Sequence, residues 1–356
     1  MSRKRILLTA VVLTVLAVLV YLQFRTWKNF DWSTFWNEWE RVNPHHILHA
    51  IGLIYLSYLL RAFRWKVFLR PVRKEASVLA MVPPTLIGFT GLALLGRPGE
   101  LIRPYLIARR ENLTFPSQVA VWTVERIFDI GAFTVLMVLA IFLPTALHFL
   151  PNPDIYPRLR VGGFLLVALV LGMTTGAVAV AKFGEVLARW IEKRFGHLSS
   201  NLGNRIALRV REFRDGLHTI HDLFSFVEVS AASVLMWWFI AVAYREVTHA
   251  YGVSLQHMTV AKVLLLMGSS MLGSMLQLPG VGGGSQLATI AALEHIFGAP
   301  HELAASCGIL LWLVTFVAVV PLGLALAHRE HLSLRKLSEE SADQEAAILS
   351  HGPPLA

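Results

Sequence analysis

The chain has 356 residues, of which 55% are hydrophobic and only 15% are charged. Soluble globular domains carry about 25% charged residues, so the composition excludes a soluble enzyme. Several apolar runs approach the roughly 20 residues that a helix needs to cross a bilayer. They predict an all-α, polytopic membrane protein. The single cysteine, Cys307, excludes an internal disulfide. We expect the formal charge of +9 to face anionic lipid and not nucleic acid.

About six full transmembrane helices are predicted, at Ile6–Leu22, Ile47–Leu69, Gln118–Leu143, Val161–Ala181, Phe226–Tyr244 and Leu303–Ala327. The first follows a basic Arg3-Lys4-Arg5 segment and precedes no small-residue cleavage site, which favours a retained signal anchor. Arg61, Arg64 and Lys66 lie near the end of the second helix, where we expect them to snorkel to the interface.

Two further apolar stretches contain residues that interrupt helices. Ser77–Leu95 includes Pro83-Pro84 and runs into Gly96, whereas Val260–Leu278 runs into the Pro279–Gly284 segment. Broken backbone is tolerated at membrane depth only where protein or a wet cavity surrounds it. Because paired broken segments indicate the binding site of a transporter, we predict two re-entrant segments of opposite orientation, over residues 77–110 and 260–297.

The distribution of basic residues predicts the orientation. In this topology, 24 of the 32 Lys and Arg residues lie on the inner side and 7 on the outer side. The positive-inside rule therefore places both termini in the cytoplasm. Residues 1–327 are predicted to form a single integral membrane domain, and residues 328–356 a flexible cytoplasmic tail.

Two amphipathic helices are predicted outside the spans. Residues 31–41 carry four aromatic side chains at helical spacing behind a capping residue, Asp31. This helix is either a structural aromatic belt in the interface or a ledge for lipid access. A basic cytoplasmic helix is predicted at about 183–224. Its apolar stripe either packs on the protein or recruits anionic lipid or a partner helix.

The strongest functional signal is charge inside a predicted span. Glu125, Arg126 and Asp129 lie in Gln118–Leu143, and each unpaired charge at the bilayer centre costs roughly 2.5–3.5 kcal/mol. The first broken segment carries a second charged cluster of Arg97, Glu100 and Arg103. We expect Arg97 or Arg103 to meet Glu125 or Asp129. The cluster is either a structural ion-pair lock or a site for an anion or lipid headgroup, because guanidinium groups match phosphate oxygens.

Other motifs carry weaker signals. The backbone amides of Gly282, Gly283 and Gly284 could cradle a phosphate, but no Lys-Ser/Thr follows them, which excludes a nucleotide P-loop. The histidines near residue 45 have no nearby cysteine or acid in the sequence, and we predict no metal site and no cofactor.

Four sequence motifs together resemble the flippase-like membrane family that includes the transmembrane part of lysylphosphatidylglycerol synthases. They are Arg61-x-x-Arg64-Trp65-Lys66, Gly96-Arg97-Pro98-Gly99-Glu100-Leu101-x-Arg103, Glu125-Arg126-x-x-Asp129 and Pro279-Gly280-Val281-Gly282-Gly283-Gly284. The resemblance covers about residues 45–325. It implies two re-entrant segments around a central cavity, and lipid translocation or a link to envelope glycolipid and polyprenyl-phosphate pathways.

The chain departs from that pattern in two places. No aminoacyl-transferase domain follows Ala327 in this sequence, so lipid aminoacylation is not expected. Gln286 stands where the family usually has a glutamate, which argues against a cationic headgroup or proton coupling there.

The leading hypothesis is a non-enzymatic protein of a bacterial or archaeal plasma membrane that moves a lipid with an anionic or phosphate-bearing headgroup between leaflets. Arg97, Arg103 and Arg126 would hold the headgroup, with Glu100, Glu125 and Asp129 positioning them. Gly282, Gly283 and Gln286 would contribute from the second broken segment. The alternative is a non-transporting partner or regulator of an envelope biosynthetic enzyme.

Overall fold

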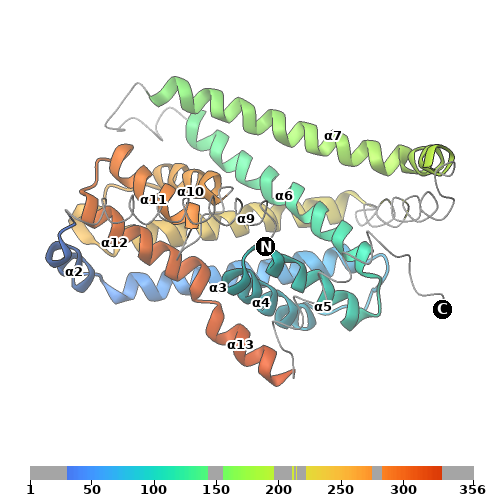
Figure 1. The fold of residues 1–356 in the computed structure, drawn as a ribbon, viewed down its shortest axis with the longest axis horizontal. Coiled ribbons are helices and arrows are strands. Elements are labelled where there is room, and N and C mark those ends of the chain that lie inside the picture. Colours follow the sequence, from blue (N-terminus) through green and yellow to red (C-terminus); the bar gives the residue numbers. More distant parts are fainter. Residues whose placement is uncertain are drawn as a thin grey trace, which may run out of the picture.

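The computed structural model describes residues 30–142, 155–195, 211, 214, 222–274 and 283–330, and every regular element in these ranges is a helix (Figure 1). Five helical segments are long and apolar enough to cross a bilayer: Pro44–Leu69, Val78–Leu95, Leu159–Gly176, Leu223–His249 and His301–Arg329. The predicted all-α fold of a polytopic membrane protein is therefore confirmed. The predicted span Ile6–Leu22 and almost all of the predicted tail lie outside the described residues.

Helix α2 (Trp32–Glu40) begins where the capping signal predicts. The Asp31 carboxylate accepts hydrogen bonds from the amides of Ser33 at 2.9 Å and Thr34 at 3.2 Å. The aromatic residues of the helix divide between two environments. Phe35 is buried against α12 (His301–Trp312), whereas Trp32 and Trp36 remain about half exposed. Helix α2 is thus fastened to the bundle by one face and presents indoles on the other.

The first predicted broken segment forms a helical hairpin of α4 (Val78–Leu95), the short 3-10 helix η1 (Arg97–Leu101) and α5 (Ile102–Glu111). The stretch is interrupted, as predicted, but at Gly96 and not at Pro83-Pro84. The two prolines lie inside α4, and the chain reverses at Gly96, whose φ of +70° favours glycine. Gly88 lets the two helices touch, since a Cβ there would lie 2.5 Å from the Arg103 Cβ.

The second predicted broken segment also folds back on itself. Helices α10 (Val260–Ser274) and α11 (Gly283–His295) pack side by side, with Gly273 directly against Gly284. Residues 275–282, which include Gly282 of the predicted site, lie outside the described residues. The re-entrant insertion of both hairpins, from opposite sides of a membrane, stays a prediction.

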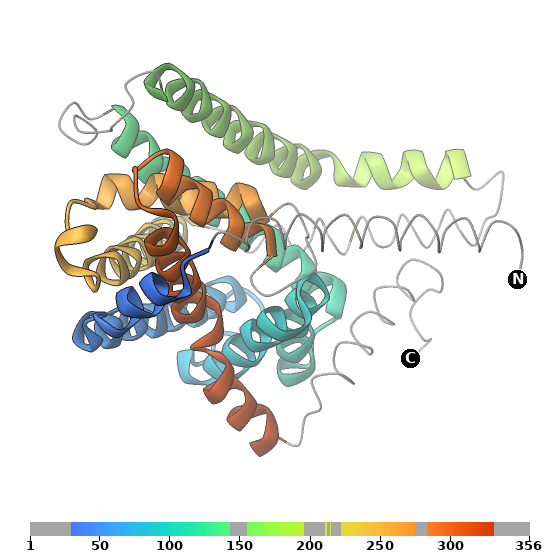
Figure 2. The ribbon, with the colours of Figure 1, turned by 60° about the vertical axis from the view of Figure 1, so that its left-hand side comes forward.

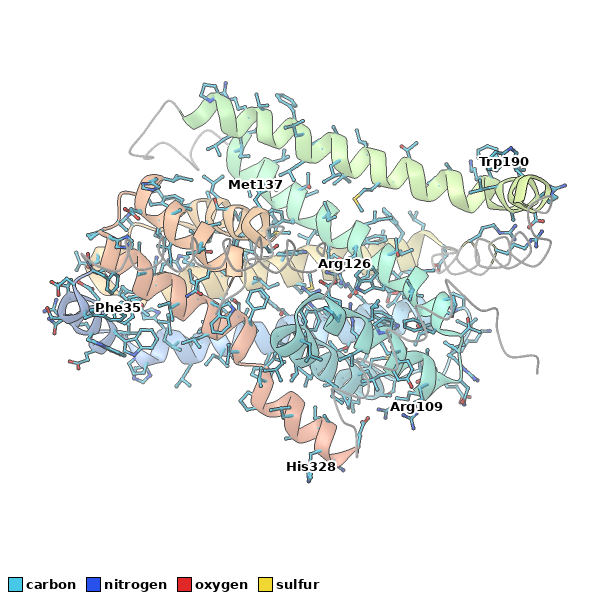
Figure 3. The ribbon with its side chains drawn as sticks, in the orientation of Figure 1. Phe35, Arg109, Arg126, Met137, Trp190 and His328 are labelled. Carbon is cyan, nitrogen blue, oxygen red and sulfur yellow. The ribbon has the colours of Figure 1, made fainter. Side chains whose placement is uncertain are left out.

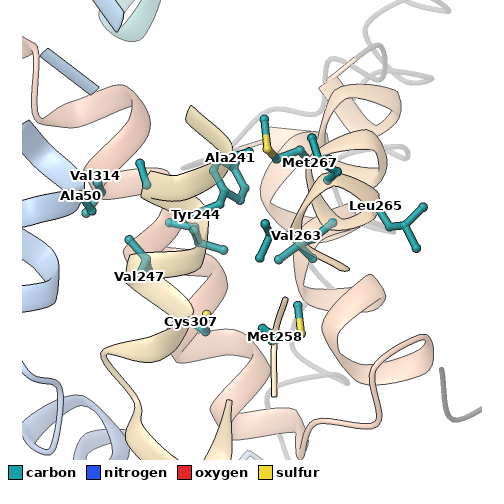
Figure 4. Packing of buried hydrophobic residues seen from close by; sticks show 14 of the residues in the cluster. Ala50, Ala241, Tyr244, Val247, Met258, Val263, Leu265, Met267, Cys307 and Val314 are labelled. Atoms are coloured by element: carbon teal, nitrogen blue, oxygen red, sulfur yellow. The ribbon is translucent and has the colours of Figure 1, made fainter. Parts of the chain in front are cut away.

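The main core lies where α3 (Pro44–Leu69) and α9 (Leu223–His249) pack along each other and against α10 and α12. Asn43 and Asp222 cap the N-termini of α3 and α9. Small buried residues, among them Ala50, Ala241 and Cys307, bring these helices close together (Figure 4). A short 3-10 helix, η2 (Gly252–Ser254), follows α9.

Helix α7 (Ile155–Phe195) lies along the outside of the bundle against α6 (Phe115–Phe142), as Figures 1 and 2 show. Its 41 residues span about 60 Å, roughly twice the hydrocarbon thickness of a bilayer. The helix therefore continues without a break beyond its apolar window, and no separate helix begins near residue 183 as predicted. Phe224, at the end of that predicted helix, lies in α9. The intervening residues are outside the described part, except Arg211 and Arg214, which pair with Glu185.

The last predicted span is interrupted in its middle. Helix α12 passes into a π-helical turn, η3 (Leu313–Val317), and α13 (Val320–Arg329) follows, projecting from the bundle in Figure 2. The hydroxyls of two α3 tyrosines satisfy carbonyl groups at this irregularity. Tyr55 donates to the Ala318 carbonyl at 2.8 Å, and Tyr58 donates to the Thr315 carbonyl at 3.4 Å. π-Helical turns are frequent at functional sites, and this turn borders the cavity described below.

Candidate functional site

Helix α6 carries two carboxylates into the interior of the protein. Glu125 and Asp129 are one turn apart on the same face of the helix, and both are buried. Arg126, beside them, lies near the middle of the bundle in Figure 3, whereas Arg109 and Trp190 lie at its periphery. Two carboxylates at this depth require cationic partners, because an unpaired buried charge is strongly unfavourable.

Helix α3 supplies the arginine that joins the two acids. The Arg64 side chain is fully buried, and its guanidinium donates to Glu125 Oε1 and to Asp129 Oδ1, each at 2.6 Å. Its Nη1 also donates to the hydroxyl of Ser233, on α9, at 2.8 Å. One turn earlier, Arg61 Nη1 lies 3.3 Å from Asp129 Oδ2. Both arginines therefore point into the interior, and the prediction that they snorkel to the interface is wrong.

The first hairpin supplies a third arginine. Both Nη atoms of Arg103, on α5, donate to the Glu125 carboxylate in a bidentate pair. The Arg103 guanidinium also lies over the Trp65 ring, 4.5 Å from its centroid, and the Trp65 indole is itself held by Gln118. The expected contact between the first hairpin and the α6 acids is thus confirmed, through Arg103.

Arg126 completes the cluster from α6 itself. Its Nη2 lies 3.1 Å from Asp129 Oδ2, three residues along the same helix. About one third of its side chain is exposed, into a narrow crevice that Glu100 and Arg103 also line. Glu100 therefore faces the two arginines that it was predicted to position.

Positive charge exceeds negative charge in this cluster. In the described part of the chain, four guanidinium groups from Arg61, Arg64, Arg103 and Arg126 contact only two carboxylates. The buried Nε–H groups of Arg61, Arg64 and Arg126 find no acceptor among the described residues. A buried donor without an acceptor costs about 1–3 kcal/mol. The cluster is therefore positively charged and incompletely hydrogen-bonded within the described residues.

A cavity of about 160 Å³ adjoins the cluster at Arg61. Phe89 of the first hairpin and residues of α3, α9, both helices of the second hairpin and η3 form its wall. Its polar lining is mostly hydroxyl groups, from Ser57, Tyr58, Tyr244, Ser270, Ser274, Ser285 and Thr315. This central cavity therefore combines one arginine with neutral hydrogen-bonding groups. Apolar side chains supply most of the exposed wall, so the cavity is amphipathic, with the arginine and the hydroxyl groups as its polar part.

Comparison with known proteins accounts for this arrangement of motifs. The family model described as the lysylphosphatidylglycerol synthase TM region matches residues 7–323. The chain belongs to this family. A UPF0104 membrane protein of Methanothermobacter thermautotrophicus is 22% identical over 294 residues, which cover 80% of this chain and 86% of the relative. The suspected relation to the synthase membrane region is thereby confirmed.

A second relative matches only in part. Glycosyltransferase AglD of Haloferax volcanii is 26% identical over 130 residues, which are 36% of this chain and 20% of that protein. No solved structure matches the chain.

The remaining predicted site residues of this TM-region protein lie apart from the cluster or outside the description. The backbone of Arg97 begins η1, and nothing is described of its side chain. Gly283 and Gln286 lie in the first turn of α11. Within the described residues, the neighbouring Ser285 lines the central cavity, and these two residues do not. In this turn, Ser285 and not the predicted Gln286 contributes to the cavity.

The histidines near residue 45 have a structural partner. His46 Nδ1 lies 2.6 Å from Glu246 Oε2 of α9, and His49 Nδ1 lies 3.8 Å from the same oxygen. Among the described residues, no group of three or more His, Cys, Asp or Glu side chains could hold a metal ion.

Proposed function

We propose that this membrane protein moves a lipid with an anionic headgroup from one leaflet to the other. The observation that carries the proposal is the buried cluster in which four arginines face two carboxylates, next to a hydroxyl-lined cavity. Guanidinium groups bind phosphate oxygens in a bidentate manner, and three buried Nε–H groups remain available for such oxygens. The site binds and guides the lipid and does no covalent chemistry.

The surroundings of the cluster suit the other end of an amphiphile. A groove of about 450 Å³ runs between α6, α7 and α9, and its wall is almost entirely apolar. Ser233 lies at this groove and also accepts a hydrogen bond from Arg64. A hydrocarbon chain in the groove would therefore lie beside the arginines that bind its headgroup.

The two hairpins support a passage through the membrane. Each hairpin contains a helix too short to cross a bilayer: α5, α10 and α11 have 10, 15 and 13 residues, against the roughly 20 needed, although α4 with 18 is long enough. We infer that both hairpins turn inside the membrane around the central cavity, entering from opposite sides. We place the protein in the plasma membrane of a bacterium or archaeon, with both termini in the cytoplasm, as the distribution of Lys and Arg predicts.

Lipid scrambling in proteoliposomes tests the proposal. Fluorescent phosphatidylglycerol and phosphatidylcholine are compared as probes, with wild type, Arg126→Ala and Arg61→Gln. We expect wild type to move phosphatidylglycerol faster, and each variant to lose at least tenfold of that rate. The control is Arg245→Ala, which removes an exposed arginine from the far end of α9. Transport that survives both cluster variants, or folded wild type that moves neither lipid, would overturn the proposal.

A second candidate function is support of an envelope biosynthetic enzyme without transport. The partial likeness to a protein named a glycosyltransferase favours it. The apolar residues predicted to form a stripe between α7 and α9, Phe213 and Leu217 among them, would then dock the enzyme. Copurification of a glycosyltransferase that is lost when these two residues become polar would support this function, and failure to recover any such enzyme would count against it.

A further inference from the structure

One aromatic side chain separates the central cavity from the crevice at Arg126. Phe89, on α4, lines both spaces: the central cavity of about 160 Å³ with Arg61, and the crevice of about 20 Å³ with Arg103 and Arg126. Cationic groups therefore line both spaces beside the Phe89 ring. The two sets are close together, because Arg61 and Arg126 both contact Asp129 Oδ2, and the Phe89 ring is part of the wall between the spaces that they line.

The ring is held by three contacts. The Arg61 guanidinium lies 4.8 Å from the centroid of the ring, and the Arg103 guanidinium lies 5.3 Å from it. The Tyr58 ring packs on it at a centroid distance of 4.9 Å. Guanidinium groups are attracted to the face of an aromatic ring. The same two groups would bind an incoming anion, which then competes with the ring for them.

The backbone on both sides of Phe89 is fixed, while its side chain has room. Gly88 lies against the backbone of Arg103, and the hydroxyl of Thr90 donates to the Val319 carbonyl at 3.3 Å. Both flanking residues are buried, whereas Phe89 is half-buried because it faces the two spaces. Opening is therefore a rotation of the ring, which needs no movement of α4. Side-chain rotations are fast compared with movements of whole helices.

We propose that Phe89 is the barrier in a single passage for anionic headgroups. With the ring in place, Arg61 and the Arg103–Arg126 pair face separate spaces that open toward opposite sides of the membrane. When an anion draws the guanidinium groups from the ring, the ring turns aside and the headgroup moves from one set to the other. The movement of lipid rests on the proposed function, whereas the barrier between the two spaces does not.

The test measures access and not transport. Cys307, the single cysteine, is buried, so Cys307→Ala provides a background without thiols. Ser57→Cys reports on the central cavity, and Leu92→Cys reports on the crevice. Each cysteine variant is treated with the membrane-impermeant reagent 2-sulfonatoethyl methanethiosulfonate. Spheroplasts expose the outer side of the membrane to the reagent, and inverted membrane vesicles expose the cytoplasmic side. With Phe89 present, we expect the two cysteines to react from opposite sides only.

Removal of the ring should join the two spaces. In Phe89→Ala, each cysteine should react from both sides, with at least a tenfold faster reaction from the side that was closed. Phe89→Leu retains bulk without an aromatic face, and should give an intermediate rate. The matched control is Phe128→Ala, which removes a ring from the apolar groove and should leave the labelling pattern unchanged.

The outcomes separate the barrier from the proposed function. One-sided labelling that persists in folded Phe89→Ala, or two-sided labelling already present with Phe89, overturns the barrier. If Phe89→Ala does not fold, Phe89→Leu replaces it: labelling from both sides supports the barrier, and labelling from one side only overturns it. If the ring controls labelling but no variant moves phosphatidylglycerol, the barrier stands and lipid translocation fails.

Discussion

The two helical hairpins close in the same way but are fastened to the rest of the protein differently. In each, a glycine of one helix lies against the other helix: Gly88 against Arg103 in α4–α5, and Gly273 against Gly284 in α10–α11. Arg103 also forms a buried salt bridge with Glu125 of α6. In the described part of the second hairpin, the salt bridge to the next helix joins Glu294 to His301, and both side chains are about one third exposed.

This difference indicates which hairpin is able to move. Displacement of α5 would separate Arg103 from Glu125 and leave a buried charge without a partner, which costs about 3–5 kcal/mol. Displacement of α10 or α11 breaks apolar packing, including that of Leu264, Leu266 and Leu293 in the main core, but leaves no buried charge without a partner. The partly exposed Glu294–His301 contact contributes at most about 1 kcal/mol. We therefore expect the first hairpin to be the fixed wall of the central cavity and the second to be the movable one.

The largest effect is expected from Glu125→Gln, which removes the anchor of the first hairpin. Arg103 would lose its carboxylate partner in a buried site, and Arg64 would keep only Asp129. The free energy of unfolding should fall by about 3–5 kcal/mol, measured by detergent denaturation followed by tryptophan fluorescence. Glu228→Gln is the control, because Glu228 pairs with Arg70 at 2.8 Å with both groups partly exposed. A loss below about 1 kcal/mol is expected there; equal losses would show that burial of the cluster does not matter.

A smaller loss of stability is expected when the glycine at the helix contact of each hairpin is replaced by alanine. Gly88→Ala and Gly273→Ala each place a Cβ against the neighbouring helix, and overpacking costs about 1–3 kcal/mol. The two should differ when combined with Glu125→Gln. Gly88→Ala should be non-additive by at least about 0.5 kcal/mol, since α5 carries the partner of Glu125, whereas Gly273→Ala should be additive. Measured coupling of Glu125→Gln to Gly273→Ala instead would reverse the assignment of fixed and movable walls.

The sequence predicts the first hairpin better than the network around it. The pairing of Arg103 with Glu125 follows from the rule that charges in a span need partners. The buried positions of Arg61 and Arg64 were not predicted, because a long side chain near a helix end can also reach the interface. Only the depth of α3 relative to α6 decides between these positions, and depth is a property of packing. The spacing of Arg61 and Arg64, one turn apart like Glu125 and Asp129, was the available signal.

Helix boundaries also show where sequence signals compete. Pro83 and Pro84 each remove one backbone hydrogen bond, but the helix continues through the half-buried Pro83 and the buried Pro84, and the chain reverses at Gly96. Helix α7 passes from apolar to charged residues without ending, since a change of solvent does not by itself interrupt backbone hydrogen bonds. The composition therefore predicts the apolar stretch of α7 better than the point at which the helix ends.

The smallest effect concerns α2, which packs against α12, the neighbour of α11. Hydrogen bonds from Ser33 and Thr34 lower the pKa of Asp31 from 3.8 to about 2. Because the folded-state pKa is depressed, the contribution of this cap to stability is complete above the ordinary pKa and is lost as the pH falls through about 2. Hydrogen exchange between pH 5 and pH 2, corrected for intrinsic rates, should show falling protection in α2 and a slight loss in α11. Helix α5 should not respond. Asp31→Asn keeps a hydrogen-bond acceptor without a titrating group, so it should abolish the pH dependence of protection in α2. An equal loss of protection in α5 would contradict the expectation that α2 is coupled only to the second hairpin.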